Sequence, residues 1–87
     1  MRNVYKVSRS AMEVLNYILR YKTENNGKSP SVREIMKGCG FRSTSVAHYH
    51  LKRLQSAGVI EREAGKVRSI RIIHEVWSSL SAGRVNG

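Results

Sequence analysis

The chain has 87 residues and a formal net charge of +10, from 16 Lys and Arg against 6 Asp and Glu. This length suits one small domain with a thin core, and the charge favours a polyanionic partner, DNA or RNA before an acidic membrane surface. The single cysteine, Cys39, excludes an intrachain disulfide, and no apolar run approaches the roughly 18 residues of a membrane span. The sequence therefore predicts a soluble cytoplasmic protein with no membrane partner.

The first predicted elements are a basic arm over residues 1–8 and a helix over Arg9–Glu24. The arm is consistent with a segment near phosphates and equally with a frayed terminus. Ser10 and Glu13 have the S-x-x-E spacing of a capping box at the start of the helix, and Asn25-Asn26-Gly27 is expected to end it. Apolar residues at helical spacing predict a buried stripe along this helix: Ala11, Val14, Leu15, Ile18 and Tyr21.

A second, shorter helix is predicted after the extended connector Lys28-Ser29-Pro30, because the residue before a proline is biased away from helix. Ser31 and Glu34 again have capping-box spacing. Gly38 and Gly40 are expected to end this helix, and a short glycine-containing turn between helices is typical of a helix-turn-helix motif. The buried edge of the helix is predicted to consist of small and medium apolar side chains: Val32, Ile35, Met36 and Cys39.

The third predicted helix, within residues 43–58, has two different faces. Ser43 is an N-cap type, whose side-chain oxygen is expected to accept from a backbone N–H of the first turn, and Gly58 can adopt the left-handed conformation that ends a helix. The inner face is predicted to contain Ala47, His50, Leu51 and Leu54. The outer face has no aliphatic residue and contains Ser45, His48, Tyr49 and Lys52. Such a helix suits a DNA major groove, although an ordinary solvated face has the same pattern.

After the third helix the apolar period changes from 3.6 to 2, which predicts a β-hairpin. We expect strands over residues 59–63 and 67–73, joined by the turn Ala64-Gly65-Lys66, with Ile70 and Ile72 on one face. A basic hairpin after a helix-turn-helix pair is typical of the wing of a winged-helix domain, which can meet phosphates or a minor groove.

The predicted fold class is α+β, mostly α: a winged helix-turn-helix domain over residues 9–73, with three helices followed by a β-hairpin wing. Residues 74–87 form a tail in which Val76, Trp77 and Leu80 predict a short helical turn, followed by a disordered stretch. Trp77 can pack on the domain or on a second copy of the chain, and the sequence does not decide between them.

Residues 8–73 resemble the N-terminal DNA-binding domain of LexA, the SOS-response repressor. The matching runs are residues 13–15, 30–35, 40–43, 50–54, 58–60 and 68–71. Their order and spacing match almost without gaps. The resemblance implies a winged helix-turn-helix fold and sequence-specific binding of double-stranded DNA by a transcriptional regulator or repressor. It also implies a bacterial or phage-encoded protein associated with the nucleoid.

The chain departs from the LexA pattern in three respects. It has Ser29-Pro30 where the family usually has two consecutive prolines. Nothing after Ile73 is long enough for the self-cleaving protease domain of that family, so self-cleavage and the dimerisation of that domain do not carry over. The chain is expected to be a stand-alone relative or a fragment, and pairing as a homodimer on DNA stays open. The outward positions of the third helix also differ from those of better-known members, so we expect an operator different from the usual SOS box.

Candidate DNA contacts follow from the resemblance and from the outer face of the third helix. The residues expected to read base edges are Ser43, Ser45, Val46, His48 and Tyr49, with Val46 touching a thymine methyl. The residues expected to lie against phosphates are Lys28, Arg33, Arg42, Thr44, Lys52, Arg53, Lys66, Arg68 and Arg71.

Enzymatic functions have little support, because no Ser/His/Asp grouping, phosphate loop or paired carboxylate is evident. His48 and His50 diverge by about 200° on a helix and cannot chelate one metal together, so we predict no metal, cofactor or small-molecule ligand. The competing interpretations are a winged-helix module that binds another protein and a module that binds RNA through the same basic face. The small polar outer face of the third helix argues against both.

Overall fold

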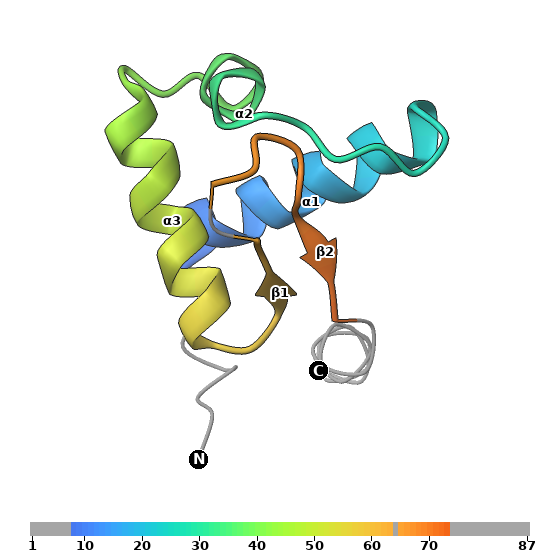
Figure 1. The fold of residues 1–87 in the computed structure, drawn as a ribbon. Coiled ribbons are helices and arrows are strands. Elements are labelled where there is room, and N and C mark those ends of the chain that lie inside the picture. The colour runs from blue at the N-terminus through green and yellow to red at the C-terminus, as the bar shows by residue number, and fades with distance from the viewer. Residues whose placement is uncertain (1–7, 64, 74–87) are drawn as a thin grey trace, which may run out of the picture.

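The computed structural model describes residues 8–63 and 65–73, which form three helices followed by a two-stranded antiparallel hairpin (Figure 1). The elements are α1 (Arg9–Glu24), α2 (Val32–Cys39), α3 (Thr44–Ser56), β1 (Ile60–Glu61) and β2 (Arg71–Ile72). The predicted order and class are confirmed. Residues 1–7 of the predicted arm and the tail with Trp77 lie outside the described residues. Within the described part, no helix has the length and apolar character needed to cross a bilayer.

α1 has the predicted bounds but a different cap. Ser8, which was assigned to the arm, is the N-cap, and its hydroxyl accepts a hydrogen bond from the backbone N–H of Ala11 at 3.1 Å. The predicted capping box of Ser10 and Glu13 is wrong, because Ser10 already lies inside the helix. A cap requires the extended backbone that Ser8 has, with ψ of 164°.

α2 is short and is held by its two caps. Ser31 accepts from the N–H of Glu34 (3.2 Å) while the Glu34 carboxylate accepts from the N–H of Ser31 (2.9 Å), so the predicted capping box is confirmed. Gly40, at φ 73°, ends the helix in the left-handed region, as predicted. Gly38 does not end it: it lies inside α2, where a Cβ would overlap the ring of Tyr17. Its missing side chain lets α1 and α2 approach closely.

The core lies between the three helices and the base of the hairpin. Its buried members are Ala11, Val14, Leu15 and Ile18 of α1, Ile35 of α2, Ala47, Leu51 and Leu54 of α3, Ala57 after α3, and Val59, Ile60, Ile70 and Ile72 of the hairpin. Tyr21 of the predicted stripe and Val32, Met36 and Cys39 of the predicted edge of α2 are only half-buried. Full burial of one Val, Leu or Ile side chain contributes about 1.5–3 kcal/mol. This packing orients α3 on α1 and α2.

The hairpin, called the wing from here on (residues 59–73), pairs over a shorter length than predicted. The cross-strand pairs are Ile60 with Ile72 and Glu61 with Arg71. Beyond them the Ser69 hydroxyl accepts from the N–H of Glu63 at 3.0 Å. Because a side chain takes the place of a backbone partner there, the ladder stops and the chain opens into a loop. In Figure 1 this loop crosses in front of α1 and reaches α2.

Candidate nucleic-acid interface

The start of α3 follows the turn at Gly40 and differs from expectation in one respect. Ser43 occupies the N-cap position with an extended backbone (φ −150°, ψ 164°), but its side chain makes no cap hydrogen bond. The prediction that its hydroxyl caps the first turn is therefore wrong. Among the described residues the hydroxyl has no hydrogen-bond partner, which leaves it able to bond with an external group. At the other end, Gly58 follows the helix at φ 76°, as predicted.

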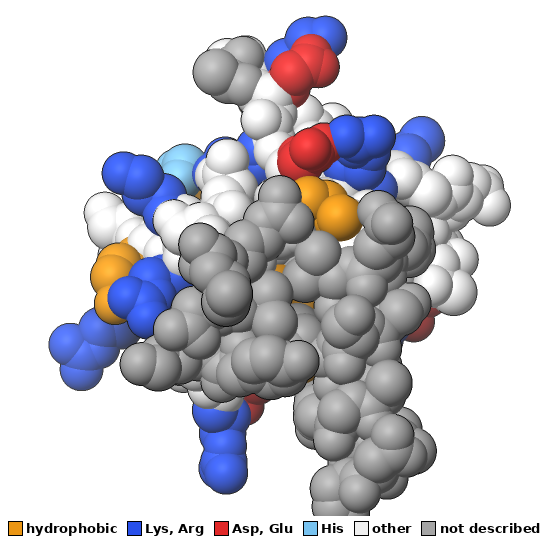
Figure 2. All heavy atoms as spheres, turned by 90° about the horizontal axis from the view of Figure 1, so that it is seen from below, with side chains coloured by type: hydrophobic (Ala, Val, Ile, Leu, Met, Phe, Trp, Pro, Cys, Tyr) orange, Lys and Arg blue, Asp and Glu red, His pale blue; other side chains and the backbone are white. Residues whose placement is uncertain are grey.

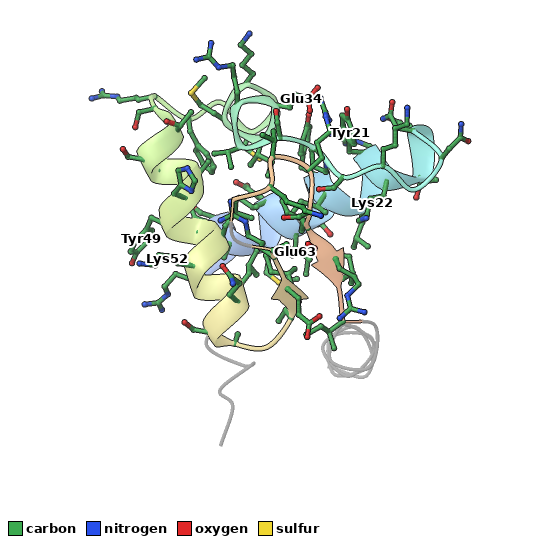
Figure 3. All side chains as sticks on the ribbon, viewed as in Figure 1. Tyr21, Lys22, Glu34, Tyr49, Lys52 and Glu63 are labelled. Atoms are coloured by element: carbon green, nitrogen blue, oxygen red, sulfur yellow. The ribbon has the colours of Figure 1, made fainter. Side chains whose placement is uncertain are left out.

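The two faces of α3 are those that its periodicity predicts. Ala47, Leu51 and Leu54 are fully buried. The outward side chains of Ser45, His48, Tyr49 and Lys52 are all exposed, whereas Val46 is half-buried. Figure 3 shows Tyr49 and Lys52 pointing away from the rest of the molecule. The helix is therefore anchored on one side and offers hydroxyl, imidazole, phenol and ammonium groups on the other.

Tyr49 is exposed but not loose. The residue is 57% exposed, and its ring meets the ring of His50 edge-on, with centroids 5.2 Å apart. His50 in turn packs on Phe41, 5.3 Å between centroids, and the guanidinium of Arg53 lies 6.0 Å from the centroid of the Tyr49 ring. The half-buried His50 lies at the edge of the inner face. These contacts restrict the rotamers of Tyr49, which reduces the entropy cost of ordering it against a ligand.

The basic residues of the wing stand beside acidic ones. Lys66 Nζ lies 3.1 Å from Glu63 Oε1, and Arg71 forms an ion pair with Glu61. In Figure 2, red and blue side chains stand side by side over the wing, at the top of the view, whereas the blue side chains at the left, over α3, have no red neighbour in this view. Exposed pairs of this kind contribute about 0–1 kcal/mol, so they lower the positive potential of the wing more than they rigidify it.

Arg68 differs from the other wing cations in the number of its partners. Its Nη1 donates to Glu34 Oε1 (2.8 Å), to the carbonyl of Ser29 (3.0 Å) and to the hydroxyl of Tyr21 (3.1 Å). The bond from Arg68, with that from the backbone of Ser31, holds the pKa of Glu34 at about 2, well below its usual value. The same carboxylate raises the pKa of Arg68. Both groups stay charged at neutral pH.

The wing divides the predicted phosphate contacts into two groups. A groove of about 760 Å³ lies between α3, the start of α2 and the wing, and its lining includes His48, Gln55, Arg33, Arg62 and Lys66. A second depression lies on the other flank of the wing, and its lining includes Lys28 and Arg71 together with the end of α1. The structure thus brings Arg33 and Lys66 to the outward side of α3 and places Lys28 and Arg71 elsewhere, whereas Arg68 borders both depressions.

The remaining predicted contacts lie on or next to α3. Arg42, Lys52 and Arg53 are exposed, and none forms a salt bridge with another described residue. Thr44 is half-buried in the first turn. These cations therefore keep their full charge for an external anion.

Two groove residues, Gln55 and Arg62, were missed from the sequence. Gln55 follows His48 by two turns of helix, so helical spacing alone places it on the same face. Arg62 had a weaker signal, because it lies between two glutamates in the predicted first strand. Only its position beside α3 makes it a candidate.

Comparison with known proteins agrees with this architecture. The model of the LexA DNA binding domain matches residues 5–69. The LexA repressor of Clostridium botulinum is 48% identical over 61 residues, which are 70% of this chain and 30% of that protein. The LexA repressor of Acetivibrio thermocellus is 36% identical over 74 residues, 85% of this chain and 34% of that protein. That of Carboxydothermus hydrogenoformans is 36% identical over 69 residues, 79% of this chain and 33% of that protein.

The chain spans about a third of the length of the curated relatives that it matches. The family match covers α1, α2, α3, β1 and most of the wing, which are the elements that build the groove and the outward face of α3. The chain belongs to the LexA DNA-binding domain family.

Proposed function

We propose that this chain binds double-stranded DNA at specific sequences, by placing α3 in the major groove, and that it acts in transcriptional repression. The observation that carries the proposal is the outward face of α3: exposed hydrogen-bonding side chains on a helix whose opposite face is fully buried. An α-helix fits the major groove, where each base pair presents a distinct pattern of donors and acceptors. Membership of a DNA-binding family supports it independently.

The proposed base contacts come from the first two turns of α3 and its cap. Ser45, His48 and Tyr49 are exposed, and the Ser43 hydroxyl is unused by the described residues. Half-buried Val46 is limited to an apolar contact with a thymine methyl. Each good base contact is worth about 1–3 kcal/mol of discrimination.

The proposed phosphate contacts surround α3 on two sides. Thr44 and three cations lie on α3 or just before it: Arg42, Lys52 and Arg53. Across the groove lie Arg33 at the start of α2 and Lys66 on the wing, and we include Arg62, which lines the same groove. Lys28 and Arg71, on the far flank of the wing, act through their long-range field, which salt screens over roughly 10 Å.

We propose further that two copies pair on a palindromic operator, because one domain of this size contacts only a short half-site. The expected location is the bacterial cytoplasm, on the nucleoid. The operator is expected to differ from the usual SOS box, since the groups facing the bases differ. The proposal assigns no catalytic step and no small-molecule ligand to these residues.

In-vitro site selection from a random duplex pool tests the proposal. We expect one enriched sequence with two half-sites about 10 base pairs apart, or a multiple of that spacing. Gel shifts with the selected duplex, a scrambled duplex and an RNA duplex of the same sequence then measure specificity. Tyr49→Ala is the matched variant, and the sequence that it selects should change at one position of each half-site.

A pool that yields no enriched sequence, with equal binding of DNA and RNA duplexes, would contradict the proposal and favour the RNA-binding alternative. Absence of nucleic-acid binding at low salt would favour the protein-interaction alternative.

A further inference from the structure

The loop of the wing is tied at one point to α1, to the connector before α2, and to α2 itself. Arg68 bridges Tyr21 of α1, Ser29 of the connector and Glu34 of α2. Tyr21 also donates to the second oxygen of Glu34, at 3.2 Å. Figure 3 shows Tyr21 and Glu34 side by side where the wing loop reaches α2. We call these four residues the wing anchor.

The backbone of the wing is held at the same place. The N–H of Ile70 donates to the hydroxyl of Ser29 at 3.1 Å, in a buried position where Ser29 is 6% and Ile70 3% exposed. A buried N–H without a partner costs about 1–3 kcal/mol, so this bond resists opening. Arg68 and Ile70 therefore join one short segment of the wing to the connector through both a side chain and the backbone.

The partners of Arg68 make it a poor phosphate contact. Its guanidinium already has a carboxylate, a phenol and a carbonyl as acceptors, and Glu34 is itself held by Ser31 and Tyr21. These acceptors surround Nη1, so a phosphate at that nitrogen would have to replace them, and a phosphate at Nε or Nη2 would have to share the positive charge with Glu34. Nη1 is thus the point at which the partners from α1, the connector and α2 meet.

We propose that Arg68 is a positioning residue: through Glu34, Tyr21 and Ser29 it holds the wing at the start of α2 and so sets the width of the groove across which Arg62 and Lys66 face α3. This inference rests on the proposed DNA-binding function. It replaces the sequence-based expectation that Arg68 itself contacts a phosphate. Because Glu34 belongs both to the α2 cap and to the anchor, the helix-turn-helix pair and the wing are oriented by one carboxylate.

The variant Glu34→Gln distinguishes an anchoring role of Arg68 from a phosphate-binding role, because the two roles predict opposite changes in DNA affinity. Gln keeps the N3 position of a capping box but removes the charge that holds Arg68. If Arg68 is an anchor, binding to the selected duplex weakens, on the order of fivefold to tenfold. If Arg68 contacts a phosphate and Glu34 competes for it, binding strengthens instead. Glu61→Gln is the matched control: it removes a wing carboxylate outside the anchor and should strengthen binding slightly.

Arg68→Lys and Arg68→Ala give a second comparison. Lys keeps the charge for a phosphate, but its side chain is one atom shorter, so its ammonium nitrogen ends short of the position that Nη1 occupies among the three acceptors. We expect both variants to lose affinity on the order of tenfold. The double variant Arg68→Ala with Glu34→Gln should bind DNA about as well as Arg68→Ala alone, because both changes remove the same interaction. Wild-type affinity of Arg68→Lys, or tighter binding by Glu34→Gln, would overturn the proposal.

The Kd values are measured at a temperature where circular dichroism shows each variant to be fully folded. An ion pair that only stabilises the fold would lower Tm and leave those Kd values unchanged, which would also overturn the proposal. Amide hydrogen exchange provides a readout without DNA. Arg68→Ala should speed exchange at Ile70 relative to Leu51 in α3, and unchanged exchange at Ile70 would contradict the anchor. If wild type binds no duplex, the proposed function fails, while the exchange result still decides whether the anchor exists.

Discussion

α3 and the wing are both basic, yet they use their charges differently. The outward cations of α3 form no ion pair with another described residue, whereas Lys66, Arg68 and Arg71 of the wing each form a salt bridge with a glutamate. A paired cation has to give up its partner, or share it, before it neutralises a phosphate. A count of Lys and Arg therefore overstates the phosphate contacts of the wing and describes those of α3 better.

The largest expected effect is the salt dependence of DNA binding. If about five phosphates are neutralised, mainly from α3 and the groove, log K should fall against log salt with a slope of about −4.5. This corresponds to roughly a 500-fold loss of affinity between 50 and 200 mM salt. Fluorescence anisotropy with the selected duplex measures the slope. A nearly flat dependence would show that neither α3 nor the wing binds DNA through its positive charges.

Substitution of the outward face of α3 should change specificity without changing stability. For Tyr49→Ala we expect a loss of about 1–3 kcal/mol of discrimination at one base pair, and a Tm close to wild type because the ring is largely exposed. Competition gel shifts with single-base variants of the site measure this. Leu51→Ala, on the buried face of the same helix, is the control and should lower stability by about 2–5 kcal/mol. An equal loss for every duplex would show that Tyr49 does not read a base.

Two variants that each remove one positive charge compare the regions directly. Lys52→Ala should reduce the salt slope by about 0.9, as expected for one phosphate contact. Arg71→Ala should change it much less, because Arg71 is paired with Glu61 and lies on the far flank of the wing. If parallel salt titrations show that both variants reduce the slope equally, the paired cation of the wing neutralises phosphate as well as the unpaired cation of α3.

The smallest effect concerns stability in acid. The pKa of Glu34 is about 2 in the folded protein, against 4.5 ordinarily. Since the folded pKa is depressed, the ionised carboxyl stabilises the fold fully above about pH 4.5, and this contribution disappears as pH falls towards 2. Urea unfolding should show wild type more stable than Glu34→Gln at neutral pH, with the difference shrinking below about pH 4. A difference independent of pH would show that the charge is not its cause.

Features that depend on residues close together in the chain were predicted most reliably from the sequence. The bounds of α1, the Ser31–Glu34 capping box and the glycine that ends α2 were predicted correctly, because each depends on residues within one or two turns. The division of α3 into two faces followed from its period. The caps predicted at Ser10 and Ser43 were wrong, because a shift of one or two residues, or of one side-chain rotamer, decides whether a hydroxyl reaches a first-turn amide.

Distant contacts were decided by the tertiary structure alone. Gly38 was predicted to end α2, but it lies within the helix against Tyr17 of α1. Arg68 and Glu34 are 34 residues apart in the chain, and no spacing rule relates a hairpin residue to a helix cap. Packing between elements also decides on which flank of the wing each cation lies. Arg33 and Lys66 lie on one flank, and Lys28 and Arg71 lie on the other. Periodicity determines which side of an element is buried, whereas packing between elements determines which exposed charges meet each other and which are left to meet DNA.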